Sequence, residues 1–159
     1  MSNRIDYATA SPAGYGALAN VHATLQKSGL PETLINLVYL RVSQINGCAF
    51  CIDMHSRDLL KAGVEVDKLV LVPVWHEADK VFTARERAAL AWAETVTRVD
   101  ETGVPDADYN AAAAEFNDKE LADLTYAIAL MNAFNRLGVA FRPTPAAVAK
   151  ANRAAANAN

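Results

Sequence analysis

Residues 37–64, LVYLRVSQINGCAFCIDMHSRDLLKAGV, contain the pattern that decides the fold. Before Gly47, apolar residues recur at spacings of three and four, the period of a helix that packs against a core. After Gly47, two cysteines and a histidine follow at helical spacing, and Gly63 supplies a residue that readily closes a helix. The stretch predicts one helix from Pro31 to about Asn46 and a second from Cys48 to Ala62.

The rest of the chain is also predicted to be helical. Ala is the most frequent residue, and the 7 Gly and 6 Pro fall mostly where helices would begin or end. Thr83 with Glu86, and Asn117 with Glu120, have the spacing of capping boxes that begin a helix. Residues 67–72 suit either a short helix or a strand. The further predicted helices are 12–27, 84–98, 111–116 and 121–141.

The length of 159 residues and the net charge of −3 predict a single soluble domain. We expect an all-α bundle of about six to eight helices over residues 1–145, followed by an Ala/Asn-rich tail, 146–159, that frays or is disordered. Basic residues are scattered, so we expect no nucleic-acid partner. Because there is no long apolar run and no signal-peptide pattern at the N-terminus, we expect a cytoplasmic protein with no membrane partner.

Cys48, Cys51 and His55 form the constellation with the clearest chemistry. Their offsets of i, i+3 and i+7 place the three side chains on one side of a helix. Along the axis His55 lies about 6 Å from Cys51 and about 10.5 Å from Cys48, and it leans toward Cys51. Cys48 is predicted to start the helix, where unpaired N–H groups favour a negative sulfur. The pattern is typical of a redox pair in which one thiolate attacks and the second thiol closes a disulfide.

A C-x-x-C pair alone leaves two alternatives open. Zinc normally takes four ligands, and this pair offers two Cys and one well-placed His, so a Cys₂His site with an open position is the first alternative. The second is a pair of small buried side chains in an Ala-rich core. A non-catalytic module that binds zinc or senses redox state would belong to these alternatives. For the redox pair we expect no metal and no bound cofactor.

Three stretches together resemble a known family. They are 37–64, FTARERAALAWAETVT at 82–97 and LTYAIALMNAFNRLGVAFRP at 124–143, and they resemble the AhpD-like (alkyl hydroperoxidase D) branch of the carboxymuconolactone decarboxylase family. The C-x-x-C-x-x-x-H motif that follows S-Q-I-N-G is the most specific part. The resemblance implies an all-α fold that assembles as a homo-oligomer, a trimer or a hexamer.

The resemblance also implies a thiol peroxidase or disulfide reductase in antioxidant defence. In such proteins the second cysteine, here Cys51, attacks a hydroperoxide, the first, here Cys48, resolves it, and His55 relays protons. A lipoylated protein can regenerate the dithiol, and a peroxiredoxin is a further partner of some members. The lyase activity for which the family is named is an alternative, which the two cysteines disfavour because lyase members generally lack the C-x-x-C pair.

One position departs from the family pattern. The family relay usually includes a Glu 12 residues before the first cysteine, where this chain has Asn36. An amide orients a hydrogen bond but cannot accept a proton at neutral pH. Glu32, one turn earlier, could supply a carboxylate, although we favour a structural role for it as a first-turn acid. If Asn36 leaves His55 without a carboxylate, we expect slow reaction with peroxide and a Cys51 pKa near the ordinary value of about 8.5.

Other polar residues are expected to be structural. His76 is predicted to be exposed or simply hydrogen-bonded, and Asp53 lies about 160° around the helix from His55, too far to be its partner. Tyr39 and Arg41 could at most line the cleft. The remaining group interrupts an apolar helix and is expected to cap another helix or to pair across a subunit boundary: Asn132, Asn135 and Arg136.

Overall fold

The structure, a computed structural model, describes residues 3–158, and all regular structure in this range is helical. Within it, 7 helices have at least seven residues. They are α2 (Pro12–Leu25), α3 (Glu32–Ile45), α4 (Ala49–Lys61), α6 (Ala84–Thr97), α8 (Asp106–Ala113), α9 (Asp118–Phe141) and α10 (Ala146–Ala156). The shorter ones are α1 (Tyr7–Ala10), α5 (Val66–Leu71), the 3₁₀ helix η1 (Val72–Glu77) and α7 (Val99–Thr102). The predicted all-α class is confirmed.

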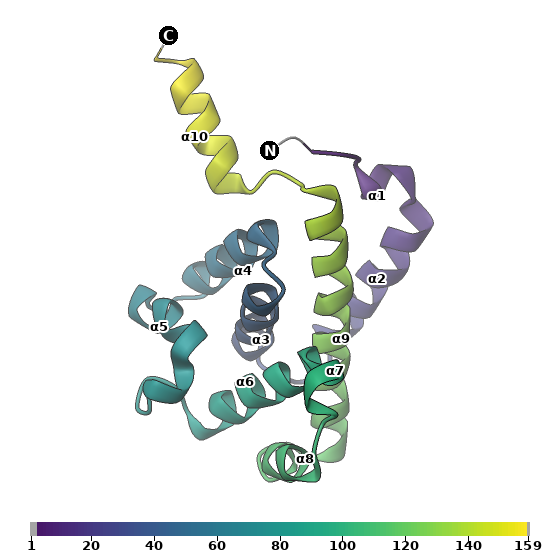
Figure 1. The fold of residues 1–159 in the computed structure, drawn as a ribbon, viewed down its shortest axis with the longest axis vertical. Helices are drawn as coiled ribbons and strands as arrows, with labels where there is room; N and C mark the ends of the chain where they lie inside the picture. Colours follow the sequence, from purple (N-terminus) through teal and green to yellow (C-terminus); the bar gives the residue numbers. More distant parts are fainter. Residues whose placement is uncertain (1–2, 159) are drawn as a thin grey trace.

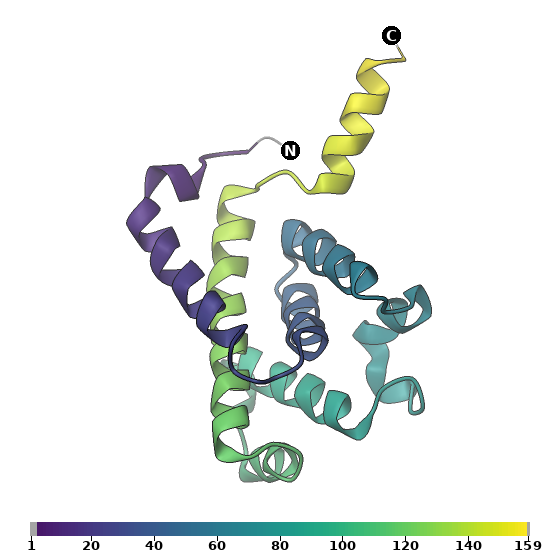
Figure 2. The same ribbon diagram turned by 180° about the vertical axis from the view of Figure 1, so that it is seen from behind.

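Helix α3 lies at the centre of the molecule. Figures 1 and 2 show it enclosed by α4, α6 and α9, which are its main neighbours. Every residue from Leu37 to Ser43 is buried, and most of these side chains are apolar. A helix that is apolar around most of its circumference packs against neighbours on several sides, as α3 does.

The turn between α3 and α4 is short. Gly47 makes it with a φ of 67°, in the left-handed region that favours glycine. Cys48 then occupies the N-cap position of α4, and its sulfur accepts a hydrogen bond of 3.4 Å from the backbone N–H of Cys51. The predicted start of this helix is therefore confirmed, and the turn sets the cysteines against the centre of the fold.

Helix α9, the longest at 24 residues, runs beside α2, α3 and α6. Its capping box at Asn117 and Glu120 is formed as predicted, and so is the one at Thr83 and Glu86 that begins α6. One face of α9 is buried, while Tyr126 on the other is 64% exposed. No helix between residues 3 and 158, α9 included, is long and apolar enough to cross a membrane.

Two segments differ from the sequence-based expectation. The helix expected at 111–116 begins earlier, as α8, because Pro105 occupies its N-cap and two acidic residues in its first turn favour that end. The tail expected to fray forms α10, which projects from the rest of the molecule in Figures 1 and 2 and buries none of its residues. Asp53 of α4 holds the base of α10 by accepting a hydrogen bond of 3.2 Å from the Ala147 N–H.

Candidate active site

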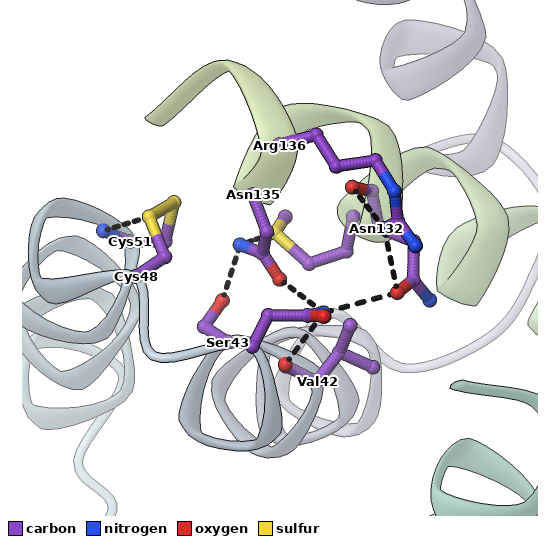
Figure 3. The surroundings of a disulfide bond; sticks show 9 residues. Val42, Ser43, Cys48, Cys51, Asn132, Asn135 and Arg136 are labelled. Carbon is purple, nitrogen blue, oxygen red and sulfur yellow. Dashed lines mark hydrogen bonds between the residues drawn. A yellow bond between two sulfur atoms is a disulfide. The ribbon is translucent and has the colours of Figure 1, made fainter. Parts of the chain in front are cut away.

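A disulfide joins Cys48 and Cys51 at the N-terminal end of α4 (Figure 3). Their Cα atoms are 5.4 Å apart, a separation that a disulfide spans without moving the backbone. Both residues are buried, with 1% of Cys48 and 3% of Cys51 exposed. The two sulfurs predicted to approach each other are thus bonded.

His55 lies one turn after Cys51 on α4 and is 4% exposed. Its Nδ1 is 3.1 Å from Oδ1 of Asn36 on α3. Because an amide oxygen only accepts, Nδ1 carries the ring proton and Nε2 keeps its lone pair. Nε2 is buried and has no hydrogen-bond partner among residues 3–158. The ring is therefore fixed in one tautomer with its accepting nitrogen unused.

Burial lowers the pKa of His55 to about 4, and nearby His22 contributes to the shift. His55 is consequently neutral at pH 7. Asp58, one turn further along α4, places a carboxylate oxygen 3.9 Å from Nδ1 of His55, but this side chain is half-exposed and water screens its charge. The sequence analysis missed Asp58, although its i, i+3 spacing from His55 is a usable signal.

A cavity of about 690 Å³ lies beside Cys51 and His55. Both residues line it, whereas Cys48 does not. Much of its wall is aromatic or thioether in character, contributed by Tyr7, Tyr15, Phe50, Met54, Met131 and Phe134. A small molecule in this space can therefore reach Cys51 and the histidine but not Cys48.

Three further residues from the sequence analysis also line the cavity: Asn36, Tyr39 and Glu32. Tyr39 is fully buried, its hydroxyl is 3.4 Å from Nδ1 of His22, and burial raises its pKa. Its ring also packs against His55, with the ring centres 5.0 Å apart. Glu32 is exposed in the first turn of α3, and the described part of the chain contains no hydrogen bond or ion pair between it and His55. This position fits the structural role that we favoured for Glu32.

Helix α9 approaches the disulfide through Gly138, which does not line the cavity. A Cβ atom at this position would lie 2.6 Å from Sγ of Cys48 and 3.4 Å from Sγ of Cys51. The first distance is too short for any real side chain, so glycine alone permits this contact. The sequence analysis missed Gly138; an isolated glycine within a helical pattern is the signal that could have identified it.

A network of amide side chains anchors the end of α3 just before Cys48 (Figure 3). Nδ2 of Asn46, the C-cap residue of α3, is 3.0 Å from the side-chain oxygens of both Asn132 and Asn135 of α9. Asn135 is fully buried and donates to Oγ of Ser43 over 3.0 Å, and Arg136 donates to the Asn132 carbonyl over 2.9 Å. Asn132 and Asn135 thus bond to side chains at the end of α3, and Arg136 bonds within α9. Among residues 3–158 none of these contacts caps a backbone group of another helix, so that expectation is wrong, and pairing across a subunit boundary stays a prediction.

Arg41 and His76 belong to a separate cluster around Glu94. Nε of Arg41 is 2.7 Å from the Glu94 carboxylate, which also accepts from Nε1 of Trp75 over 2.8 Å. Burial raises the pKa of Glu94, but these two hydrogen bonds, together with the charges of Arg41 and His76, outweigh it and leave the pKa below its ordinary value. His76 stacks on Trp75 with ring centres 4.2 Å apart and is exposed. Neither Arg41 nor His76 lines the cavity.

Metal binding was an alternative for the cysteines. Over residues 3–158, no three His, Cys, Asp or Glu side chains come together as a metal site requires. In this structure the two sulfurs are bonded to each other. Asp53, the acidic residue between Cys51 and His55 in the sequence, accepts hydrogen bonds from the Arg57 side chain and the Ala147 N–H.

Comparison with known sequences identifies relatives along most of the chain. The model of the carboxymuconolactone decarboxylase family matches residues 12–95. The uncharacterized protein YdfG of Bacillus subtilis (strain 168) is 33% identical over 140 residues, which are 88% of this chain and 95% of that protein. The uncharacterized protein YnjA of Escherichia coli (strain K12) is 34% identical over 107 residues, 67% of this chain and 58% of that protein.

Solved structures share the fold. A protein of unknown function from Agrobacterium tumefaciens, described as a proposed antioxidant defence protein AhpD, superposes with a TM-score of 0.87 at 41% identity, over 91% of this chain and 98% of that one. An uncharacterized peroxidase-related protein with an alkylhydroperoxidase AhpD core, from Ralstonia eutropha JMP134, has a TM-score of 0.74 over 86% of this chain and 74% of that one. Its identity of 24% supports the likeness of fold alone.

Proposed function

This chain belongs to the carboxymuconolactone decarboxylase family, and we propose that it is an AhpD-like thiol oxidoreductase that reduces an organic hydroperoxide or a disulfide. The observation that carries the proposal is the bonded Cys48–Cys51 pair, with Cys51 on the wall of a cavity that His55 also lines. The Agrobacterium tumefaciens structure, which is described as a proposed antioxidant defence protein AhpD, supports the same activity. A role in antioxidant defence is part of the proposal.

Cys51 is the attacking thiol, because it borders the cavity and Cys48 does not. Its thiolate attacks the terminal oxygen of R–O–OH, the O–O bond breaks, and Cys51 becomes a sulfenic acid while R–OH leaves. The Cys48 thiol then attacks the sulfenic sulfur, which releases water and forms the disulfide. In sum, one hydroperoxide and two thiols give one alcohol, one water and one disulfide.

His55 moves the proton in the first step. It is neutral at pH 7, and Nδ1 is committed to Asn36, so Nε2 is the atom that accepts the proton of the Cys51 thiol. The same atom returns that proton to the departing alkoxide. Because Asn36 is an amide, it cannot neutralise the imidazolium formed in between. We therefore expect a slower peroxidase than one with a carboxylate at this position.

A two-electron donor must return the disulfide to the dithiol. By family resemblance, a lipoylated protein is the proposed donor, and a peroxiredoxin is a proposed further partner. By the same resemblance, we also propose that the protein assembles as a homo-oligomer, either a trimer or a hexamer. A donor that carries its own dithiol would complete the cycle without a bound cofactor.

The test is intact mass spectrometry of the reduced protein after one equivalent of cumene hydroperoxide. The wild type should lose about two mass units as the disulfide forms, and Cys48→Ser should gain about 16 as its sulfenic acid accumulates. Cys51→Ser should stay unchanged. An unchanged wild-type mass, with both thiols still open to alkylation, would show an inert pair and overturn the proposal.

A further inference from the structure

The charged residues that line the cavity are all acidic. They are Asp6, Glu32 and Asp58, and none of the Lys or Arg side chains in residues 3–158 lines the cavity. We propose that this cavity admits uncharged or cationic aryl and alkyl substrates and rejects anionic ones. The inference rests on the proposed function, since it names the substrate class of the same site.

The three carboxylates come from three different elements around the cavity. Asp6 is the N-cap of α1, where the Thr9 hydroxyl and the N–H groups of Thr9 and Ala8 donate to it. The Thr9 hydrogen bonds lower the pKa of Asp6, so it is ionised at neutral pH. Glu32 begins α3, and Asp58 lies on α4 with a carboxylate oxygen 3.9 Å from His55. All three are exposed side chains, so water screens their charges in part, and they act on a ligand at close range as it enters the cavity.

Two of the four basic residues that are adjacent in sequence to a residue lining the cavity, Arg4 and Arg57, are engaged elsewhere. Arg4 donates its guanidinium to the Ala140 carbonyl over 3.0 Å and its backbone N–H to the Phe141 carbonyl over 2.9 Å, at the C-terminal end of α9. Arg57 pairs with Asp53 over 2.9 Å, on a side of α4 that does not line the cavity. An anion would thus enter without a counter-ion from these residues.

The inner wall of the cavity adds to the discrimination. Phe50, Met54, Met131 and Phe134 line the same cavity as Cys51 with apolar and aromatic surface. An anion moved against such a surface loses hydration that nothing replaces, whereas an apolar group gains. A cation is tolerated because aromatic faces and carboxylates both attract it. His55 supplies no compensating positive charge, because burial keeps its pKa near 4.

The inference also separates the two activities known in the family by name. A lactone acid, the substrate of a carboxymuconolactone decarboxylase, carries at least one carboxylate at neutral pH. The acidic lining of the cavity disfavours that ligand and leaves a neutral hydroperoxide or disulfide unaffected. The charge of the cavity and the cysteine pair are independent observations, and both favour the oxidoreductase.

The experiment compares three hydroperoxides that share one reactive core and differ in the para substituent: 4-tert-butylcumene hydroperoxide as the neutral compound, the para-carboxylate of cumene hydroperoxide and its para-trimethylammonium derivative. Reduced protein reacts with each at pH 8, where ordinary histidines are neutral, and disulfide formation is followed by quenched mass spectrometry. Each rate constant is divided by that of the same hydroperoxide with dithiothreitol. We expect the carboxylate to react at least tenfold more slowly than the neutral compound, and the cation at least as fast as the neutral one.

A charge-neutral variant tests the cause. The double variant Asp6→Asn with Glu32→Gln removes two carboxylates and keeps their shapes. The ratio of the normalised rate constants for the neutral compound and the carboxylate, which measures the preference, should fall at least threefold. Asp67→Asn, on exposed α5 outside the cavity, is the matched control and should leave the preference unchanged. Equal normalised rates for anion and neutral compound in the wild type would overturn the inference while leaving the proposed function intact.

A binding measurement separates the two claims further. The redox-inert alcohols that correspond to the three hydroperoxides are titrated into the oxidised wild-type protein. The neutral alcohol should bind at least tenfold more tightly than its carboxylate, whether or not the protein turns over hydroperoxides. The inference fails if the neutral alcohol and its carboxylate both fail to bind, or if the carboxylate binds as tightly as the neutral alcohol. If binding follows the expected order but no hydroperoxide oxidises the cysteines, the proposed function fails alone.

Discussion

The side-chain oxygen of Asn36 lies 3.1 Å from Nδ1 of His55, across the interface between α3 and α4. This contact fixes the tautomer of a histidine whose other nitrogen is buried and unpaired among the described residues. A carboxylate in the place of Asn36 would make the same contact but would also stabilise the charged ring. The contact therefore orients His55 without making it a strong base.

Asn36→Glu should accelerate the reaction of the reduced protein with cumene hydroperoxide. An ionised carboxylate beside Nδ1 raises the pKa of His55 from about 4 and lowers the cost of the transient imidazolium. We expect a rate increase of about tenfold or more, which is part of the roughly 10²–10⁴-fold that general acid–base catalysis contributes. Stopped-flow kinetics over pH 5–9 measure it, with Asn36→Gln as the uncharged control. An unchanged rate in the Glu variant would contradict the relay.

The fold was largely predictable because its signals are local. The capping boxes at Thr83 and Asn117 and the glycine at position 47 fix helix ends through interactions within a few residues. The cysteine–histidine register was predictable for the same reason, since one helix carries all three residues. Helix α10 was missed because its Ala content favours helix intrinsically, while the prediction considered only its lack of an apolar period.

The parts of the site that sequence reasoning missed depend on long-range packing. Gly138 meets the sulfurs only because α9 crosses α4 at that point, some 90 residues away along the chain. Tyr7 lines the cavity because the N-terminal segment returns to the end of α9, where the Tyr7 and Phe141 rings lie 5.9 Å apart. No spacing within one element encodes these contacts.

Acidification should destabilise the wild type more than His55→Gln. The pKa of His55 is about 4 in the folded protein and 6.5 ordinarily, so between these values the unfolded chain binds a proton that the folded one excludes. The stability contributed by neutral His55 is therefore lost as pH falls from 6.5 toward 4, by about 2–3 kcal/mol at pH 4.5. Urea unfolding of the oxidised proteins at pH 7 and 4.5 measures it. Equal losses in the two proteins would show that His55 titrates normally.

Gly138→Ala should lower the stability of the oxidised protein. The added Cβ would lie 2.6 Å from Sγ of Cys48, so α9 or the disulfide must move, at a cost of about 1–3 kcal/mol. Gly16→Ala is the matched control, because a Cβ there meets nothing within 4 Å and α2 should gain about 0.5–1 kcal/mol. Thermal and urea unfolding measure both variants. A Gly138→Ala protein as stable as the wild type would contradict the close packing of α9 on the disulfide.

Cys51 should be alkylated at least tenfold faster than Cys48 when each is the single cysteine. Cys51 borders the cavity, whereas Cys48 does not and lies against Gly138. Because His55 is neutral, it adds no positive charge that would favour a Cys51 thiolate. In the Cys48→Ser variant, the alkylation rate of Cys51 should therefore rise with pH and reach half its maximum near or above about pH 8.5. Iodoacetamide rates at pH 6–10 for Cys48→Ser and Cys51→Ser measure both quantities. Faster alkylation of Cys48 would reverse the roles of the two thiols. A half-maximal rate of Cys51 alkylation well below pH 8 would require a positive charge near Cys51, which the geometry of His55 and Asn36 does not provide.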